Sequence, residues 1–176
     1  MKISPPTTEE YAPFYADYVQ RAEARGDVIS VLPQQVDELN ILLRKLTEEQ
    51  AHFKFGPAEW SIKEVVGHLN DVERVFSYRL LRVSRNDKTP IPGFEQDDYV
   101  REAGFDHGAF KDLLQEFELL RRANILMINN IAEESTRRIG TASNHPVSAR
   151  ALIYMLVGHV EHHVASLKEK YLPGLS

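Results

Sequence analysis

The clearest helix start in the chain lies in residues 60–73, which read WSIKEVVGHLNDVE. Ser61 is followed three residues later by Glu64, and at a helix N-terminus each of these side chains accepts a hydrogen bond from the backbone N–H of the other. Apolar residues then recur at helical spacing, namely Ile62, Val65, Val66 and Leu69. This stretch therefore predicts an amphipathic helix from Ser61 to about Arg85.

Helical spacing of apolar residues recurs on both sides of this stretch. The further predicted helices are a short one at about 8–25 and longer ones from after Pro33 to about Glu49, from Asp106 to about Glu134, and from Ser148 to before Pro173. Residues 86–104 and 137–146 carry prolines and glycines and are predicted to be loops, and no segment alternates long enough to predict a sheet. We expect an all-α protein whose four long helices form a bundle behind a short N-terminal helix, in a single domain of residues 1–176.

The composition narrows the class of protein. A chain of 176 residues is long enough to bury a full hydrophobic core. The formal net charge of −5 argues against nucleic-acid binding, and no run approaches the roughly 18 apolar residues of a membrane helix. Residues 1–10 contain no apolar run typical of a signal peptide, so we expect a cytoplasmic protein. Because the chain has no cysteine, disulfides, thiolate ligands and a cysteine nucleophile are excluded.

Three of the seven histidines are predicted to face the interior together. His159 and His163 are four residues apart, so they point about 40° apart on the apolar side of the last helix. His68 lies on the apolar side of its own helix, whereas His162 falls at the edge of the apolar arc and is predicted to lie on the rim. Two imidazoles at this spacing can bind one metal ion, and a third from a facing helix would leave a coordination position open, as in catalytic sites.

Two carboxylates flank His68 on the same helix. Glu64 and Asp71 fall about 40° and 60° from it, on one side. Either carboxylate could accept the second ring N–H of a histidine, or take a proton as a general base. Because Glu64 is also needed to cap the helix, Asp71 is the stronger candidate.

The residues themselves leave three interpretations open. In the first, the protein is an enzyme whose cation activates water for hydrolysis, or activates a thiol for transfer to a small-molecule substrate held by loop 86–104 with Phe94 and Tyr99. In the second, it is a non-catalytic binding or stress-response module with a structural metal. In the third, no metal binds and neighbouring carboxylates satisfy the histidines.

Two motifs resemble those of a known family. Residues 60–73 resemble the start of the second long helix in the DinB-like superfamily, and residues 158–163, GHVEHH, resemble its fourth-helix signature, particularly in YfiT-like metal-dependent hydrolases. The resemblance spans most of the chain, from the helix of Val36 to the C-terminus. It implies an up-down-down-up connection of the four helices and a site for a divalent metal, commonly nickel or zinc, with His68, His159 and His163 as ligands.

The same resemblance carries expectations about partners and activity. Members often form homodimers through helix packing, so a homodimer is expected here. Some relatives are S-transferases or isomerases that use a low-molecular-weight thiol such as bacillithiol, mycothiol or glutathione. The resemblance therefore adds a thiol cosubstrate to the expected ligands but does not choose between hydrolysis and thiol transfer.

Overall fold

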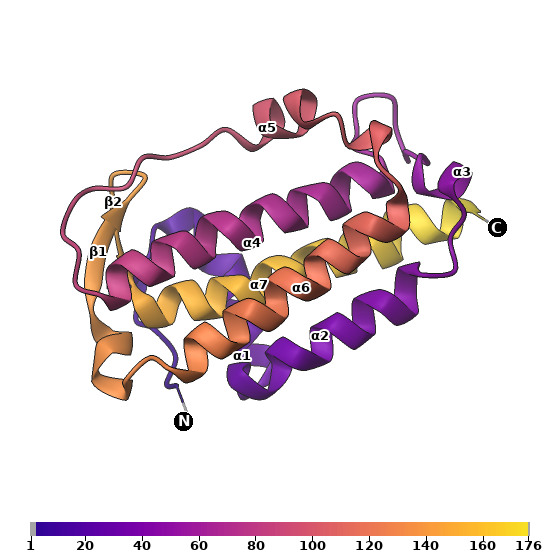
Figure 1. Cartoon of the computed structure of the whole chain (residues 1–176). Helices are drawn as coiled ribbons and strands as arrows, with labels where there is room; N and C mark the ends of the chain where they lie inside the picture. The colour runs from indigo at the N-terminus through magenta and orange to yellow at the C-terminus, as the bar shows by residue number, and fades with distance from the viewer. Residues whose placement is uncertain (1–2, 176) are drawn as a thin grey trace.

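A computed structural model describes residues 3–175, and four long helices dominate it. These are α2 (Val28–Leu43), α4 (Ile62–Ser84), α6 (Phe110–Asn129) and α7 (Ala149–Ser166). Helices α2 and α7 run in one direction along the bundle, and α4 and α6 run in the other (Figure 1). The predicted all-α bundle with its up-down-down-up connection is therefore confirmed.

Capping side chains set the starts of three of these helices. Asp27, Ser61 and Ser148 each accept a hydrogen bond from a backbone N–H two or three residues further on. The capping box predicted at α4 forms, because Ser61 Oγ accepts from Glu64 N at 3.0 Å and Ser61 N donates to Glu64 Oε2 at 2.7 Å. The predicted bounds of α4 are accordingly confirmed.

Other predicted boundaries differ from the structure. Helix α2 starts before Pro33, which lies inside it, and ends at Leu43; the short helix α3 (Glu48–Ala51) follows separately. Helix α6 begins at Phe110, since Asp106 belongs to a separate 3-10 turn. The prediction ran past Leu43 and began before Phe110 because apolar spacing does not reveal the breaks in the chain there, whereas the start of α2 was predicted too late because a proline such as Pro33 is typical of a helix start.

The N-terminal segment packs on α7. It contains the 3-10 turns Thr8–Glu10 and Pro13–Tyr15 and the helix α1 (Ala16–Arg25), so the short helix predicted at about 8–25 forms only in its second half. A Cβ atom added at Gly158 of α7 would lie 1.8 Å from the carbonyl oxygen of Tyr18. Only glycine permits so close a backbone approach, which brings α1 directly against the last helix of the bundle.

A two-stranded antiparallel sheet stands where a loop was predicted. Strands β1 (Ile139–Ala142) and β2 (His145–Ser148) pair with Ala142 opposite His145, joined by Ser143 and Asn144. Both turn residues have positive φ, which is the backbone conformation of a type I′ hairpin turn. Each strand has four residues, too few for alternation to be recognisable in the sequence.

The connection between α4 and α6 crosses the whole bundle, because these two helices run in the same direction. We call residues 86–104 the strap; it was predicted to be a loop, but it contains the helix α5 (Gln96–Ala103). Near its start, Ile91 N donates to Thr141 O of the hairpin at 2.9 Å. Just beyond its end, the ring of Phe105 covers Gly67 of α4, where a Cβ atom would lie 2.5 Å from the ring. The strap is thus attached at both ends.

A buried polar layer divides the core into two apolar clusters. Buried polar residues of the long helices form this layer at or beside the boundary between the two clusters, and it comprises Gln35, Glu73, Arg121, Asn124 and His159. Arg121 contributes most of the hydrogen bonds, donating to both carboxylate oxygens of Glu73 at 2.8 and 2.9 Å and to Gln35 Oε1 at 2.7 Å. The layer therefore links α2, α4 and α6 inside the bundle.

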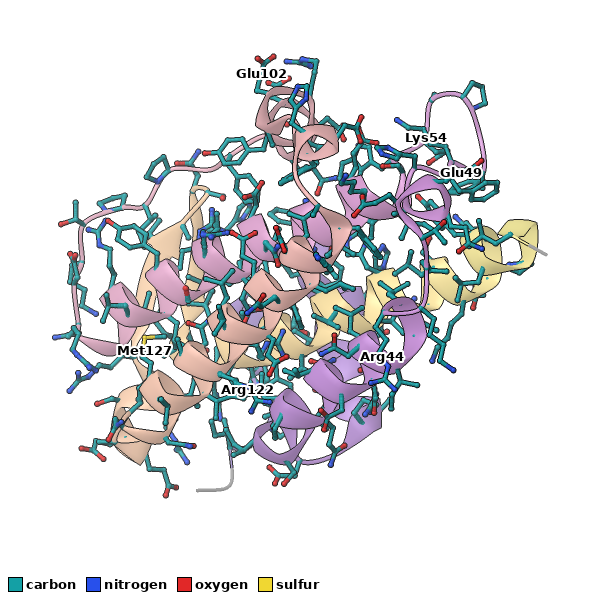
Figure 2. The ribbon with its side chains drawn as sticks, turned by 45° about the vertical axis from the view of Figure 1, so that its right-hand side comes forward. Arg44, Glu49, Lys54, Glu102, Arg122 and Met127 are labelled. Carbon is teal, nitrogen blue, oxygen red and sulfur yellow. The ribbon has the colours of Figure 1, made fainter. Side chains whose placement is uncertain are left out.

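Charged side chains cover the outside. Figure 2 shows Arg122 of α6 and Glu102 of α5 projecting away from the bundle. Among the described residues, 3–175, the structure contains no helix with the length and apolarity needed to span a membrane.

Candidate metal centre

The three histidines predicted to act together meet in the structure. His68 comes from α4, and His159 and His163 come from α7. His159 Nε2 lies 3.0 Å from His68 Nε2 and 3.1 Å from His163 Nε2. Within residues 3–175 these three form the one group of three or more potential ligand atoms from His, Cys, Asp or Glu that lie within 4.8 Å of one another.

These distances suit a shared metal ion. Two ligand atoms about 2.1 Å from one ion and about 90–100° apart are about 3.0–3.2 Å from each other. Hydrogen bonding is a poor alternative, because each ring nitrogen of a neutral imidazole is either one donor or one acceptor. His159 Nε2 can therefore bond to only one of its two neighbours. The donor set fits a divalent ion with three protein ligands and open positions.

Burial keeps these imidazoles neutral. It lowers the pKa of His68 to about 4 and those of His159 and His163 well below the ordinary value, and the neighbouring histidines lower each of them further. Neutral imidazole is the form that binds metal. At pH 7 the site therefore has three unprotonated nitrogen ligands.

His162 lies on the rim, as predicted. Its side chain is 42% exposed and its Nδ1 lies 3.0 Å from Asp17 Oδ2 of α1. Its ring centroid lies 5.1 Å from that of His163, but its nitrogens are not part of the group formed by the other three histidines, and its contact with Asp17 links α1 to α7.

Of the two carboxylates predicted to assist the histidines, Glu64 has close partners elsewhere and Asp71, among the described residues, has only charged neighbours. Glu64 Oε2 accepts hydrogen bonds from Ser61 N at 2.7 Å and is 2.8 Å from Lys54 Nζ, and these contacts outweigh burial to lower the pKa of Glu64. Burial raises the pKa of Asp71, which has Arg74 and Glu116 as its charged neighbours. A catalytic role for Glu64 or Asp71 stays a prediction.

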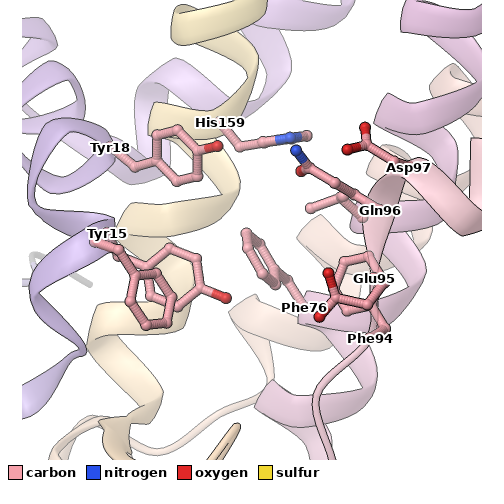
Figure 3. A pocket seen from close by; sticks show the side chains of 10 residues that line it. Tyr15, Tyr18, Phe76, Phe94, Glu95, Gln96, Asp97 and His159 are labelled. Atoms are coloured by element: carbon pink, nitrogen blue, oxygen red, sulfur yellow. The ribbon is translucent and has the colours of Figure 1, made fainter.

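Two pockets flank the histidines. The first, of about 290 Å³, reaches His159 and is lined by side chains of the N-terminal segment, α4 and the strap (Figure 3). The second, of about 270 Å³, reaches His163 and includes Trp60, whose ring centroid lies 4.8 Å from that of His68. Gln96 and Asp97 of α5 line both pockets. The first turn of α5 therefore lies between the two openings to the site.

Aromatic rings form most of the first pocket. Tyr18 lies with its ring centroid 5.4 Å from that of His159, and Tyr15 and Phe76 meet edge to face at 5.8 Å. Burial raises the pKa of Tyr18 to about 12, so its hydroxyl stays protonated at neutral pH. Phe94 lines this pocket as predicted, whereas Tyr99 contacts the ring of Phe94 at 5.1 Å without lining it.

Sequence reasoning missed the tyrosines of the N-terminal segment, and it proposed loop 86–104 as part of a pocket without identifying Gln96 and Asp97. Tyr15 and Tyr18 belong to a segment that was interpreted only as a leading helix. Gln96 and Asp97 belong to residues that were predicted to be a loop. No spacing signal could have identified them, because each reaches the site through a contact between distant segments.

Comparison with known proteins agrees with this fold. The sequence model of the DinB superfamily matches residues 32–167. The chain belongs to the DinB superfamily. A solved structure of YfiT from Bacillus subtilis, described as a probable metal-dependent hydrolase with an unusual four-helix bundle topology, is similar with a TM-score of 0.74. Identity to it is 16%, over 91% of each chain. None of the curated proteins compared with the chain matches it significantly.

Proposed function

We propose that this DinB superfamily protein is a metal-dependent hydrolase whose His68, His159 and His163 bind one divalent ion, nickel or zinc. The proposal is carried by the three Nε2 atoms, which converge at 3.0 and 3.1 Å beside two pockets. When bound, a divalent ion lowers the pKa of an adjacent water or thiol and supplies a nucleophile near neutral pH. The description of YfiT as a probable metal-dependent hydrolase points the same way.

The remaining residues of the site would bind and orient a small-molecule substrate. The aromatic wall of Tyr15, Tyr18 and Phe76 offers apolar contact to a substrate next to His159. The first turn of α5 lies between the two openings, so its side chains could contact a reactant in either pocket. Both pockets are close to the lower end of the volumes typical of small-molecule sites.

Transfer of a low-molecular-weight thiol is the second candidate function. It is favoured by the presence of two separate pockets of similar size at the same histidines, since a transferase must hold two organic reactants. The chain has no cysteine, so the thiol would be a cosubstrate. A third possibility, a non-catalytic metal-binding module, would show stabilisation by the ion without turnover.

We further propose a cytoplasmic homodimer with residues 1–176 as one domain. The dimer is supported by large apolar side chains that are exposed on α2 and α6, namely Ile41, Leu119 and Leu126. Helices α2 and α6 lie side by side on one face of the bundle (Figure 1). A second copy of this chain would cover these side chains.

Metal content tests the site. We expect purified protein to retain about one divalent ion per chain after dialysis, measured by elemental analysis, and His163→Ala to lose it because a two-ligand site binds weakly. His162→Ala is the matched control and should retain the ion, since its ring faces Asp17. Equal metal content in the wild type and His163→Ala would contradict the assignment.

Activity assays on the same preparations separate the candidate functions. The wild type, with and without metal, would be incubated with ester and amide substrates and with pairs of a thiol and an electrophile. Metal-dependent turnover of esters or amides that His163→Ala lacks supports the hydrolase. Turnover that requires the thiol supports the transferase, and no turnover in either panel supports the binding module.

A further inference from the structure

We propose that Asp97, in the first turn of α5, is the carboxylate that accepts the proton of the nucleophile at the three histidines. This assigns to the strap the role that the sequence suggested for Asp71. The inference rests on the proposed function, because it requires an ion at His68, His159 and His163. It adds a proton acceptor that comes from outside the four long helices.

The position of Asp97 is the first reason. Its side chain lines both the pocket that reaches His159 and the pocket that reaches His163. Figure 3 shows the Asp97 carboxylate and the Gln96 amide extending toward the ring of His159. The carboxylate is not a member of the ligand group, whose atoms lie within 4.8 Å of one another. It can therefore face a reactant at the ion without occupying a coordination position.

The free charge of Asp97 is the second reason. Among residues 3–175 no hydrogen bond or ion pair is formed by its carboxylate, whereas Glu64 is 2.8 Å from Lys54 Nζ. The adjacent Asp98 lies outside both pockets and pairs with Arg101 at 2.6 Å. Both residues lie in the first turn of α5, where the helix dipole stabilises a negative charge, so the dipole does not distinguish Asp97 from Asp98. Glu95 lines only the first pocket and Glu59 only the second, whereas among the described residues Asp97 is the one free carboxylate that lines both.

The attachment of the strap is the third reason, because a proton acceptor must be held in place. Arg79 of α4 is 2% exposed and donates to Pro92 O and Ser143 Oγ, both at 3.2 Å. Val100, on the inner side of α5, is 4% exposed. With Phe105 seated on Gly67, these contacts hold both ends of the strap to the bundle and keep the first turn of α5 above the histidines.

The chemistry required of Asp97 is a proton relay. A water or thiol at the site gives its proton to an Asp97 Oδ atom and keeps the electron pair, with which it attacks the electrophilic atom of the substrate. The bond to the leaving group then breaks, and the leaving group takes its electron pair with it. Asp97 returns the proton to the leaving group, which restores the carboxylate.

Binding of azide to the cobalt(II)-loaded protein tests this position without an enzymatic assay. Azide bound to the cobalt ion would face the Asp97 carboxylate and be repelled by it, and its binding is measured from the visible spectrum. We expect Asp97→Asn to tighten azide binding by about tenfold, because the substitution removes one negative charge beside the anion in a partly solvated site. The matched control Asp98→Asn should bind azide like the wild type.

The outcomes separate this inference from the proposed function. Equal azide affinity in the wild type and in Asp97→Asn, with cobalt bound to both, would overturn the role of Asp97 and leave the metal site intact. Failure of the wild type to bind cobalt would overturn the metal site and this inference together. Circular dichroism of Asp97→Asn checks that the fold is retained, which is expected because the side chain is exposed.

Discussion

At the scale of single residues, the histidines combine two properties that seldom occur together. His68 and His159 are 1% and 3% exposed, yet each brings a polar nitrogen to the same point. Burying polar nitrogens without partners is costly, and protonating them there is more costly still. The metal-free site therefore stores a penalty that a bound cation would relieve.

This penalty predicts a pH dependence for the metal-free protein. The unfolded chain takes up protons near the ordinary histidine pKa of about 6.5, whereas folded His68 does so only near its pKa of about 4. The free energy of unfolding should therefore fall as the pH drops from 7 to 5, by about 2 kcal/mol for His68 alone. Urea unfolding with a chelator measures it, and parallel pH slopes for the wild type and His68→Gln would contradict the prediction.

The spacing of residues in the sequence predicted that the histidines lie together, but it did not predict the surroundings of Glu64 and Asp71. The spacing of His159 and His163 is set within one helix, so their common direction follows from helix geometry alone. The partners of Glu64 and Asp71 are supplied in part by other segments, such as Lys54 and Glu116. The position of a residue around its helix axis does not reveal which other segments pack beside it. The direction of the Glu64 and Asp71 side chains could therefore be predicted, but the residues that they contact could not.

At the scale of elements, patterns among neighbouring residues predicted helices reliably. The sequence carries no comparable pattern for contacts between segments that are far apart in the chain. The start of α4 was predictable because Ser61 and Glu64 are three residues apart and satisfy each other. Helix α5 was not, because its place depends on the pairing of Ile91 with the hairpin and on the bonds of Arg79 to the strap. The sequence therefore revealed the four long helices, while the elements that cover the site depend on the fold as a whole.

The polar layer predicts how strongly the helices depend on one ion pair. Arg121→Met would leave the Glu73 carboxylate, 3% exposed, without its charged partner, and should cost about 3–5 kcal/mol in urea unfolding. The matched control Arg122→Met breaks a pair in which the arginine is 58% exposed and should cost at most about 1 kcal/mol. Similar losses in both variants would show that the layer contributes no more than a surface pair.

At the scale of the whole molecule, the proposed homodimer is open to a direct measurement. Light scattering should give a mass about twice the 20.1 kDa of one chain. Leu126→Lys places a charge where a side chain is 66% exposed on α6 and should shift the mass toward that of one chain. Leu81→Lys, at a position 41% exposed on α4, is the control. A dimer lost only in the control would place the interface on another face.

The glycine at position 158 has a consequence for how such a protein can diversify. It lets α1 touch the backbone of α7, so that Tyr18 borders a pocket although it precedes residues 32–167, which match the superfamily. The three histidines proposed as metal ligands and this part of the pocket wall thus belong to separate stretches of the chain. Under the proposed function, selectivity could change through the N-terminal stretch while the three histidines are inherited intact, and a mutant library confined to residues 12–18 would explore new substrates on an unchanged centre.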